Sequence, residues 1–499
     1  MSVDTTHPEY DAHRFQWERM RDVAAGRDAI LTKTLASYYR QTSTGRDLEY
    51  IAATAYLPKL SGQSREEFAA YAYRSVWFGA TDRTINALAG LIFAKPATEA
   101  LPTAIEPYAQ DITLDGCSLR ELAQQLVFEE LTTTRTGLMV DYPAVDTAGL
   151  SAAQAERLNI RPYVKVYKAE SIIDWEMGNV GGARRLVMVR LHEMIDQPGA
   201  KEFERVQVEQ YRVLDLTEGV YRVRIFRKDA AGQWITVEER FPQMRGQPMG
   251  FIPFVFVAES AVRKPLLIDL ADINLAHFRS SADLENGLHY TGLPQPVVTG
   301  AQLEPGQSLR IGGSSAWVLP DPSADAKYLE FTGQGLNTLR DSMKDKEARM
   351  AVLGARMLAE EKRAPETEGT VELRTAGERS MLAAVANDCS EAIRKALNIM
   401  AQWVGAPETA EFALSTDYGV HRMAPPMLQQ LVAAWQAGAM PLQTLFDNLQ
   451  QGEIVAPDAT FEDYQAQIDQ QAPASAQGGP PEPAGGGSIL SGLRTRLGL

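Results

Sequence analysis

The stretch Asp269–Tyr290, DLADINLAHFRSSADLENGLHY, determines how the rest of the chain is interpreted, because it can be a reactive site or a scaffold. It holds three aspartates, one glutamate and two histidines in 22 residues, which suits a metal site or acid–base chemistry. Helical ligands lie three or four positions apart, but His277 is five residues from Asp272 and six from Asp283. The apolar positions fit helical spacing better: Leu266, Leu270, Ile273, His277, Leu284 and Leu288. The stretch therefore predicts an amphipathic helix with an acidic face.

Length and composition indicate a soluble protein of several domains. The chain has 499 residues, of which 45% are hydrophobic and 23% charged, and this length exceeds that of one compact core. No apolar run reaches the ~20 residues that a membrane span requires, and the first residues lack the pattern of a signal peptide. Only Cys117 and Cys389 are present. We therefore expect a reducing compartment and no disulfide framework.

The charge distribution argues against a tight nucleic-acid binder. The net charge is −15, and no Lys or Arg occurs from Met423 to Leu493. Tight DNA binding depends on neutralising phosphates with cations. An acidic surface near DNA suits a conduit better than a clamp.

The periodicity changes once along the first half of the chain. It predicts a helix over 14–40, a long helix over 66–93 that begins at a Ser64–Glu67 capping box, and a helix over 119–135 capped by Ser118. From about residue 136 to 257 the pattern alternates with period two, and turn residues such as those of Thr217–Gly219 separate the segments. Helices followed by a largely antiparallel sheet give an α+β class.

The second half is mainly helical. Helices are predicted over 265–289, 334–361 and 371–404, the last ending at Gly405, with a small β insert at 293–333 and shorter helices after residue 424. The polar segment 363–370 interrupts the helices, and 471–487 reads as a Pro/Gly linker.

Motifs for chemistry are weak. His192-Glu193-Met194-Ile195-Asp196 is one residue short of the zinc motif HExxH, and its surroundings alternate like a strand. Phosphate-loop and nucleophile-elbow patterns are not found. An α+β enzyme that uses His192, Glu193 and the acids of 269–289 stays open as an alternative, although we expect no catalytic activity, cofactor or metal.

Four segments together resemble the portal proteins of tailed bacteriophages, and more closely a podovirus-type portal subfamily known only as a domain of unknown function. They are YLPKL at 56–60, YRSVWFGATDRTINALAGLIFAKP at 73–96, the run from GFIPFVFV to PLLIDLADINLAHFRSSADLENGLHYTGLPQPVVTG at 250–300, and MLAEEKRAPETEGTVELRTAGERSMLAAVANDC at 357–389. The resemblance covers about residues 5–450 and is a whole-chain pattern.

This resemblance implies a portal fold whose parts map onto the chain in order. They are a wing at 1–260, stem helices at 261–290 and 334–360, a clip at 291–333, a tunnel loop at 361–370, a long wing-to-crown helix at 371–410, a crown at 411–470, and a flexible linker with a C-terminal peptide at 471–499.

The resemblance also implies function and partners. We expect a homo-oligomeric, dodecameric ring at one capsid vertex, assembled in the host cytoplasm and then part of the virion. Double-stranded DNA passes through it without sequence specificity, and terminase, head-completion or tail adaptor proteins, the major capsid protein and the scaffold protein contact it. No membrane is involved.

Tunnel-loop residues expected to face DNA are Lys362, Arg363, Glu366 and Glu368. Stem residues expected at the packing or channel face are Asp269, Asp272, Ser280, Ser281 and Asp283. Another oligomeric virion component, such as a connector or minor capsid protein, is the second alternative.

Overall fold

The structure is a computed structural model, and its described residues divide into two compact units, 1–418 and 419–499. The described residues are 2–39, 56–59, 62–143, 154, 157–199, 201, 203–258, 260–291, 295–299, 325–329, 334–354, 368–416, 425–437, 439–451, 454–455 and 459–471. Each unit is considered by itself.

The N-terminal helices are shorter than their hydrophobic pattern predicts. The predicted helix 14–40 is α1 (Pro8–Ala25) followed by α2 (Arg27–Tyr39), because Gly26 adopts a φ of 87° that ends the first helix. The predicted helix 66–93 is also two helices, α4 (Arg65–Arg74) and α5 (Ala80–Ile92). The expected capping box at Ser64 is confirmed, and Ser118 caps α6 (Leu119–Thr133) in the same way.

Two antiparallel sheets confirm the predicted α+β class. The smaller sheet has the order β11 (Phe254–Phe256), β2 (Thr136–Asp141) and β3 (Tyr163–Lys168). The larger has the order β4-β5-β6-β7-β8, with strands Ile172–Val180, Ala183–Pro198, Arg205–Thr217, Val220–Lys228 and Trp234–Arg240. The turn at 217–220 joins β6 to β7 through Glu218 and Gly219, both at positive φ, as a two-residue hairpin requires.

The core of the first unit lies where α6 and the small sheet meet. Every residue of β2 is buried, and α6 buries its apolar side chains in the same hydrophobic cluster as the inner face of the large sheet. The short hairpin β9 (Gln243–Met244) and β10 (Gln247–Pro248) follows the large sheet.

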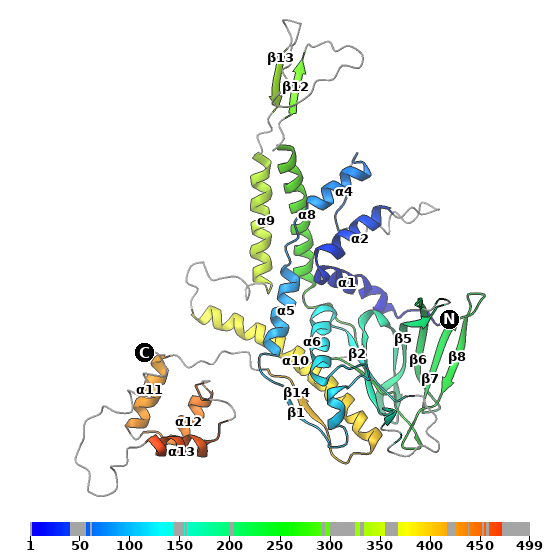
Figure 1. Cartoon of the computed structure of the whole chain (residues 1–499), viewed down its shortest axis with the longest axis vertical. Coiled ribbons are helices and arrows are strands. Elements are labelled where there is room, and N and C mark those ends of the chain that lie inside the picture. The colour runs from blue at the N-terminus through cyan, green and yellow to red at the C-terminus, as the bar shows by residue number, and fades with distance from the viewer. Residues whose placement is uncertain are drawn as a thin grey trace. The chain divides into compact units, whose positions relative to one another are not determined.

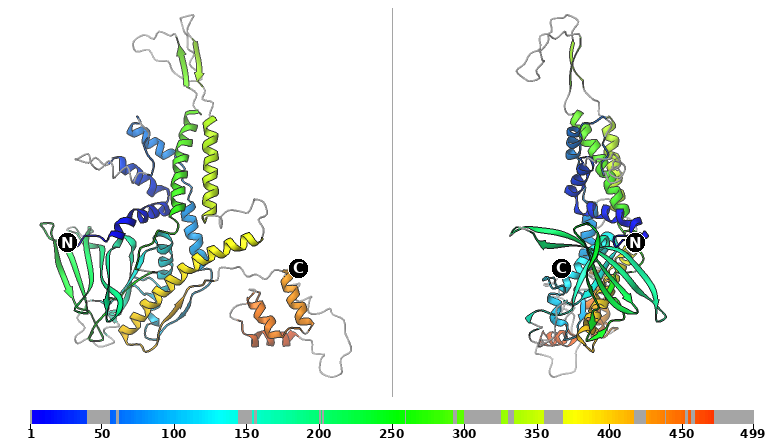
Figure 2. Two further views of the ribbon diagram at one scale, coloured as in Figure 1. Left: turned by 180° about the vertical axis from the view of Figure 1, so that it is seen from behind. Right: turned by 90° about the vertical axis from the view of Figure 1, so that its right-hand side faces the viewer.

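A pair of long helices follows the sheets (Figures 1 and 2). They are α8 (Ile268–Thr291) and α9 (Gln334–Val352), and the segment between them contains the antiparallel strands β12 (Gln295–Thr299) and β13 (Asp325–Leu329). The helix α10 (Glu368–Val404) passes close to α6 and the small sheet. It begins three residues before the predicted start, so residues 368–370 of the expected tunnel loop 361–370 are helical.

The end of α10 and the boundary of the first unit are both defined by specific contacts. As predicted, α10 ends at Gly405, whose φ of 76° allows the N–H of Ala406 to reach the carbonyl of Ala401. The strand β14 (Glu411–Ala413) then pairs with β1 (Thr98–Ala100). Residues 411–416 therefore belong to the first unit, and the expected bounds of the crown stay a prediction.

The second unit contains α11 (Pro425–Gln436), α12 (Leu442–Gln451) and α13 (Phe461–Gln471). Leu445, Phe446 and Leu449 of α12 are buried, and the Phe446 ring lies against Phe461 and Tyr464 of α13. The unit is a small helical assembly with its own apolar contacts.

Candidate functional site

The helix α8 is buried on more sides than its sequence pattern predicts. Leu270, His277 and Leu284 of the predicted stripe are buried, whereas Leu266 is 38% exposed. Further buried positions lie between them: Ala271, Asn274, Leu275, Phe278, Ser281 and Ala282. Because α1, α4, α5 and α9 all pack on this helix, the stripe is wider than one apolar face.

Two buried polar residues of α8 bind the break between α4 and α5. The Asn274 amide donates to the carbonyl of Phe78 at 2.7 Å and accepts from the Thr81 N–H at 3.2 Å. The Ser281 hydroxyl donates to the carbonyl of Val76 at 2.8 Å and accepts from its N–H at 3.1 Å. A helix break leaves backbone groups without partners, and a buried break is stable only when they are satisfied. These two side chains satisfy several of them.

The three aspartates of α8 also have partners within the chain. Asp272 pairs with Arg19 of α1 at 2.7 Å, and Asp269 pairs with Lys264 at 2.6 Å. Asp283 accepts from the Tyr71 hydroxyl of α4 at 2.5 Å. Burial and this carboxylate raise the pKa of Tyr71. The aspartates therefore join α8 to its neighbours and do not converge on one site.

Helix α9 lies antiparallel along α8. Lys346 donates to the Ser280 hydroxyl at 3.0 Å, and Glu347 lies 3.1 Å from the His277 ring nitrogen Nε2. Farther along, Gly287 faces Leu336, whose Cδ2 would be 2.5 Å from an added Cβ. Burial lowers the pKa of His277, although Glu347 acts in the opposite direction. His277 is therefore mainly neutral at pH 7.

The opposite face of α9 is exposed in the first unit. Among the described elements, α8 is the only one with which α9 packs extensively. The exposed residues of α9 include both charge signs: Arg340, Asp341, Lys344, Asp345 and Arg349. This face is available for contacts with another chain.

Of the tunnel-loop residues, Lys362, Arg363 and Glu366 lie outside the described residues. Glu368 is the first residue of α10, and its side chain also lies outside the described part. Their proposed contact with DNA stays a prediction.

The motif at His192 lies on β5, as its alternating pattern predicts. Successive side chains on a strand point to opposite faces of the sheet, so His192 and Glu193 diverge. The Nε2 atom of His192 lies 3.3 Å from Oε1 of Glu209. Glu193 is buried, and its carboxylate accepts hydrogen bonds from Lys165, Tyr167, Gln210 and Arg212. Burial alone would raise the pKa of Glu193, but Arg212 and Lys165 lower it to about 2.

The sequence did not predict that two ionisable residues, Glu130 and Arg135, are buried. Glu130 of α6 is 1% exposed, and neither of its carboxylate oxygens has a hydrogen-bond partner. Burial, together with Asp388, raises its pKa to about 8. The Arg135 guanidinium lies 4.2 Å from the centres of both the Trp175 and Phe256 rings. No signal in the sequence separates these charged residues from exposed ones.

Across the described ranges, no group of three or more His, Cys, Asp or Glu side chains could hold a metal ion. None of the helices in the described part combines the length and apolarity of a membrane span.

Comparison with known proteins gives one match to a family model. Residues 265–404, from three residues before α8 to the end of α10, match the domain of unknown function DUF4055. The predicted resemblance to a family known only as a domain of unknown function is thus confirmed over this region. No curated protein matches the chain.

Three solved structures with similarity to the chain come from gene transfer agent (GTA) particles. A chain of the native virion has 11% identity and a TM-score of 0.35, covering 78% of this chain and 94% of its own length. A chain in the neck of the empty particle, computed with C6 symmetry, has 10% identity and a TM-score of 0.36. The match covers 86% of this chain and 99% of the neck chain. A chain in the neck of the native particle, computed with C12 symmetry, has 11% identity and a TM-score of 0.36, covering 73% and 88%. At these TM-scores the likeness carries no argument about function.

Proposed function

We propose that the chain is the portal subunit of a tailed bacteriophage. Twelve copies form a ring at one capsid vertex, and double-stranded DNA enters and later leaves the capsid through it. The observation that carries the proposal is the helix pair α8–α9, which is joined to the α+β body on the α8 side and exposed on the α9 side. An exposed helix beside a fixed one gains its missing contacts when copies assemble side by side.

In this proposal α8 and α9 are the stem, and the exposed face of α9 packs on a neighbouring copy. On that face Arg340 and Lys344 are four residues apart, as are Asp341 and Asp345, so a row of cations lies beside a row of anions. Such a surface pairs with complementary charges and disfavours a misaligned contact. The strands β12 and β13 leave from and return to the same end of the antiparallel pair, so they belong to the clip, where terminase and then head-completion proteins bind.

The tunnel loop contacts DNA transiently. Lys362 and Arg363 attract phosphates, whereas Glu366 and Glu368 limit the strength of that attraction. We expect the double variant Lys362→Ala/Arg363→Ala to alter DNA packaging or retention. Normal packaging and retention of DNA by this variant would contradict the proposed contact between the tunnel loop and DNA. It would not contradict the proposed ring.

The alternatives differ in what they require. A metal-dependent enzyme that uses His192, Glu193 and the α8 acids would need these groups to converge, but His192 and Glu193 point to opposite faces of the large sheet. A connector or minor capsid protein would also be an oligomer of the virion, but it would not bind terminase.

Negative-stain images of the purified full-length chain, alone and with its scaffold protein, test the proposal. The expected particles are rings with a central hole. Only monomers in both preparations would contradict it.

A further inference from the structure

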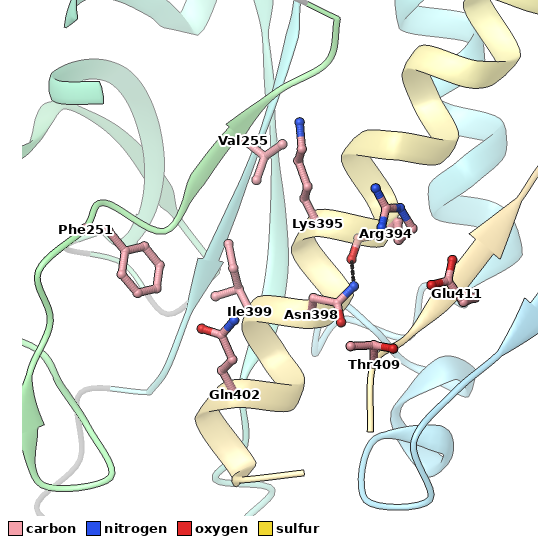
Figure 3. Close-up of a pocket in the computed structure, with 9 residues that line it drawn as sticks. All are labelled: Phe251, Val255, Arg394, Lys395, Asn398, Ile399, Gln402, Thr409 and Glu411. Carbon is pink, nitrogen blue, oxygen red and sulfur yellow. Dashed lines mark hydrogen bonds between the residues drawn. The ribbon is translucent and has the colours of Figure 1, made fainter. Parts of the chain in front are cut away.

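Two adjoining cavities lie beside the C-terminal half of α10. Their volumes are about 610 and 530 Å³, and both are lined by Phe251 and Gln402. The two cavities therefore adjoin at these side chains, and together they are called the groove. Figure 3 shows the first of them, with Phe251 and Val255 facing the residues of α10.

The groove has apolar walls that are fixed in place. Phe251 and Val255 form one wall, and Ile399 of α10 lies opposite. Lys395, Ile399 and Gln402 share one face of α10, because they are separated by four and three residues. Asn398 ties the neighbouring strand segment to α10, since its amide group bonds both the N–H and the carbonyl of Ala410 at 3.0 Å.

Cations occur at both ends of the groove. Arg394 and Lys395 line one end, where they share Glu391 as an ion-pair partner. Arg245 lines the other end, where its Cζ would be 3.0 Å from a Cβ added to Gly405. Glu411 is the one carboxylate among the residues that line the two described cavities. The lining is therefore positive in a chain whose net charge is −15.

The length of the groove suits a short extended peptide. From residue 394 to 405 a helix rises about 17 Å at ~1.5 Å per residue, which is the span of about five residues of an extended chain. We propose that the groove binds an extended acidic peptide segment of a partner protein. An apolar side chain of the peptide enters between Phe251 and Ile399, and its carboxylates pair with Lys395 and Arg245. DNA fits less well, because the apolar walls offer nothing to a run of phosphates.

Fluorescence anisotropy with the full-length chain tests this inference. The probe is the fluorescein-labelled peptide Gly-Glu-Phe-Asp-Leu-Glu-Gly, and its neutral counterpart is Gly-Gln-Phe-Asn-Leu-Gln-Gly. We expect the acidic probe to bind, the neutral peptide to bind more weakly, and Lys395→Glu to weaken binding of the acidic probe by roughly tenfold. The matched control is Lys201→Glu, at an exposed position between β5 and β6, which makes the same charge change away from the groove and should leave binding unchanged.

A second measurement does not depend on the folding of a variant. Binding of the acidic probe to the unaltered chain should weaken as salt is added, because exposed charges are screened. Equal binding of both peptides, no binding of the acidic probe at millimolar protein, or salt-independent binding would each overturn the inference. Binding of the peptide does not require that the chain forms rings. Either proposal, the peptide groove or the portal ring, can therefore be contradicted while the other stands.

Discussion

The two sides of α8 differ in how they are held. On the side of the sheets and α1–α6, the buried side chains of Asn274 and Ser281 bind backbone groups of residues 76–81, among which Thr81 is buried and Val76 is 52% exposed. On the side of α9, the polar contacts are Lys346 with Ser280 and Glu347 with His277, and Glu347 is 43% exposed. Hydrogen bonds to buried backbone are costly to lose, whereas exposed ion pairs contribute little.

This difference suggests that α8 is a rigid extension of the body and that α9 is held more weakly. A weakly held outer helix can adjust to a neighbouring copy without disturbing the fold. Four substitutions would break or sharpen this comparison, and they are given from the largest expected effect to the smallest.

The largest effect is expected for Asn274→Ala. It removes the partners of the Phe78 carbonyl and the Thr81 N–H in a buried setting, so the free energy of unfolding should fall by about 2–3 kcal/mol. Urea unfolding measures this change. Asn337→Ala on the exposed face of α9 is the control, and an equal loss in both variants would contradict the comparison.

Gly287→Val should disturb the α9 side next. The added Cβ would lie 2.5 Å from Leu336 Cδ2, the end of a flexible side chain, so Leu336 must turn away from α8 and the packing of α9 on α8 should weaken by about 1–2 kcal/mol. Hydrogen exchange should become faster in α9 and stay unchanged in β2. Gly335→Ala, where an added Cβ meets no atom within 4 Å, is the control and should cause neither change.

The burial of His277 predicts a pH dependence. The pKa of His277 is lower in the folded chain than its ordinary value of 6.5, so the unfolded chain binds more protons there. Stability should therefore be fully present above pH 6.5 and fall as the pH drops below that value, by at most about 1.4 kcal/mol per pH unit. Glu347 and Lys346 are the charged groups that face the ring.

His277→Gln should reduce this loss between pH 7 and pH 5, as measured by urea unfolding at each pH. An identical pH dependence in both proteins would show that other groups are responsible.

The smallest effect is expected for Lys346→Ala. Its contacts with Ser280 and Ser342 are only partly buried, so their loss should cost about 0.3 kcal/mol. A loss as large as that of Asn274→Ala, measured by the same urea unfolding, would mean that the two sides of α8 are held equally.

Local signals in the sequence predicted the fold class and many elements because those signals are strong. Alternation identified the strands, Ser64 and Ser118 marked helix starts, and Gly405 marked the end of α10. The break between α4 and α5 was missed because its stabilising partners, Asn274 and Ser281, lie 193 and 205 residues away along the chain.

The candidate site was predicted only in part for a related reason. Spacing argued against a metal site in the α8 stretch, but the partners of Asp272 and Asp283 come from α1 and α4 and could not be predicted. Burial of Glu130 and Glu193 was also invisible, since their neighbours come from distant segments. Long-range contacts determine these features, and periodicity does not report them.

The central claim is that the exposed face of α9 meets a neighbouring copy in a ring. Hydrogen exchange of the full-length chain, measured on separated ring and monomer fractions, tests it most directly. The account predicts that amides of α9 exchange more slowly in rings, while those of β2, already buried, stay unchanged. Equal exchange of α9 in rings and monomers would contradict it.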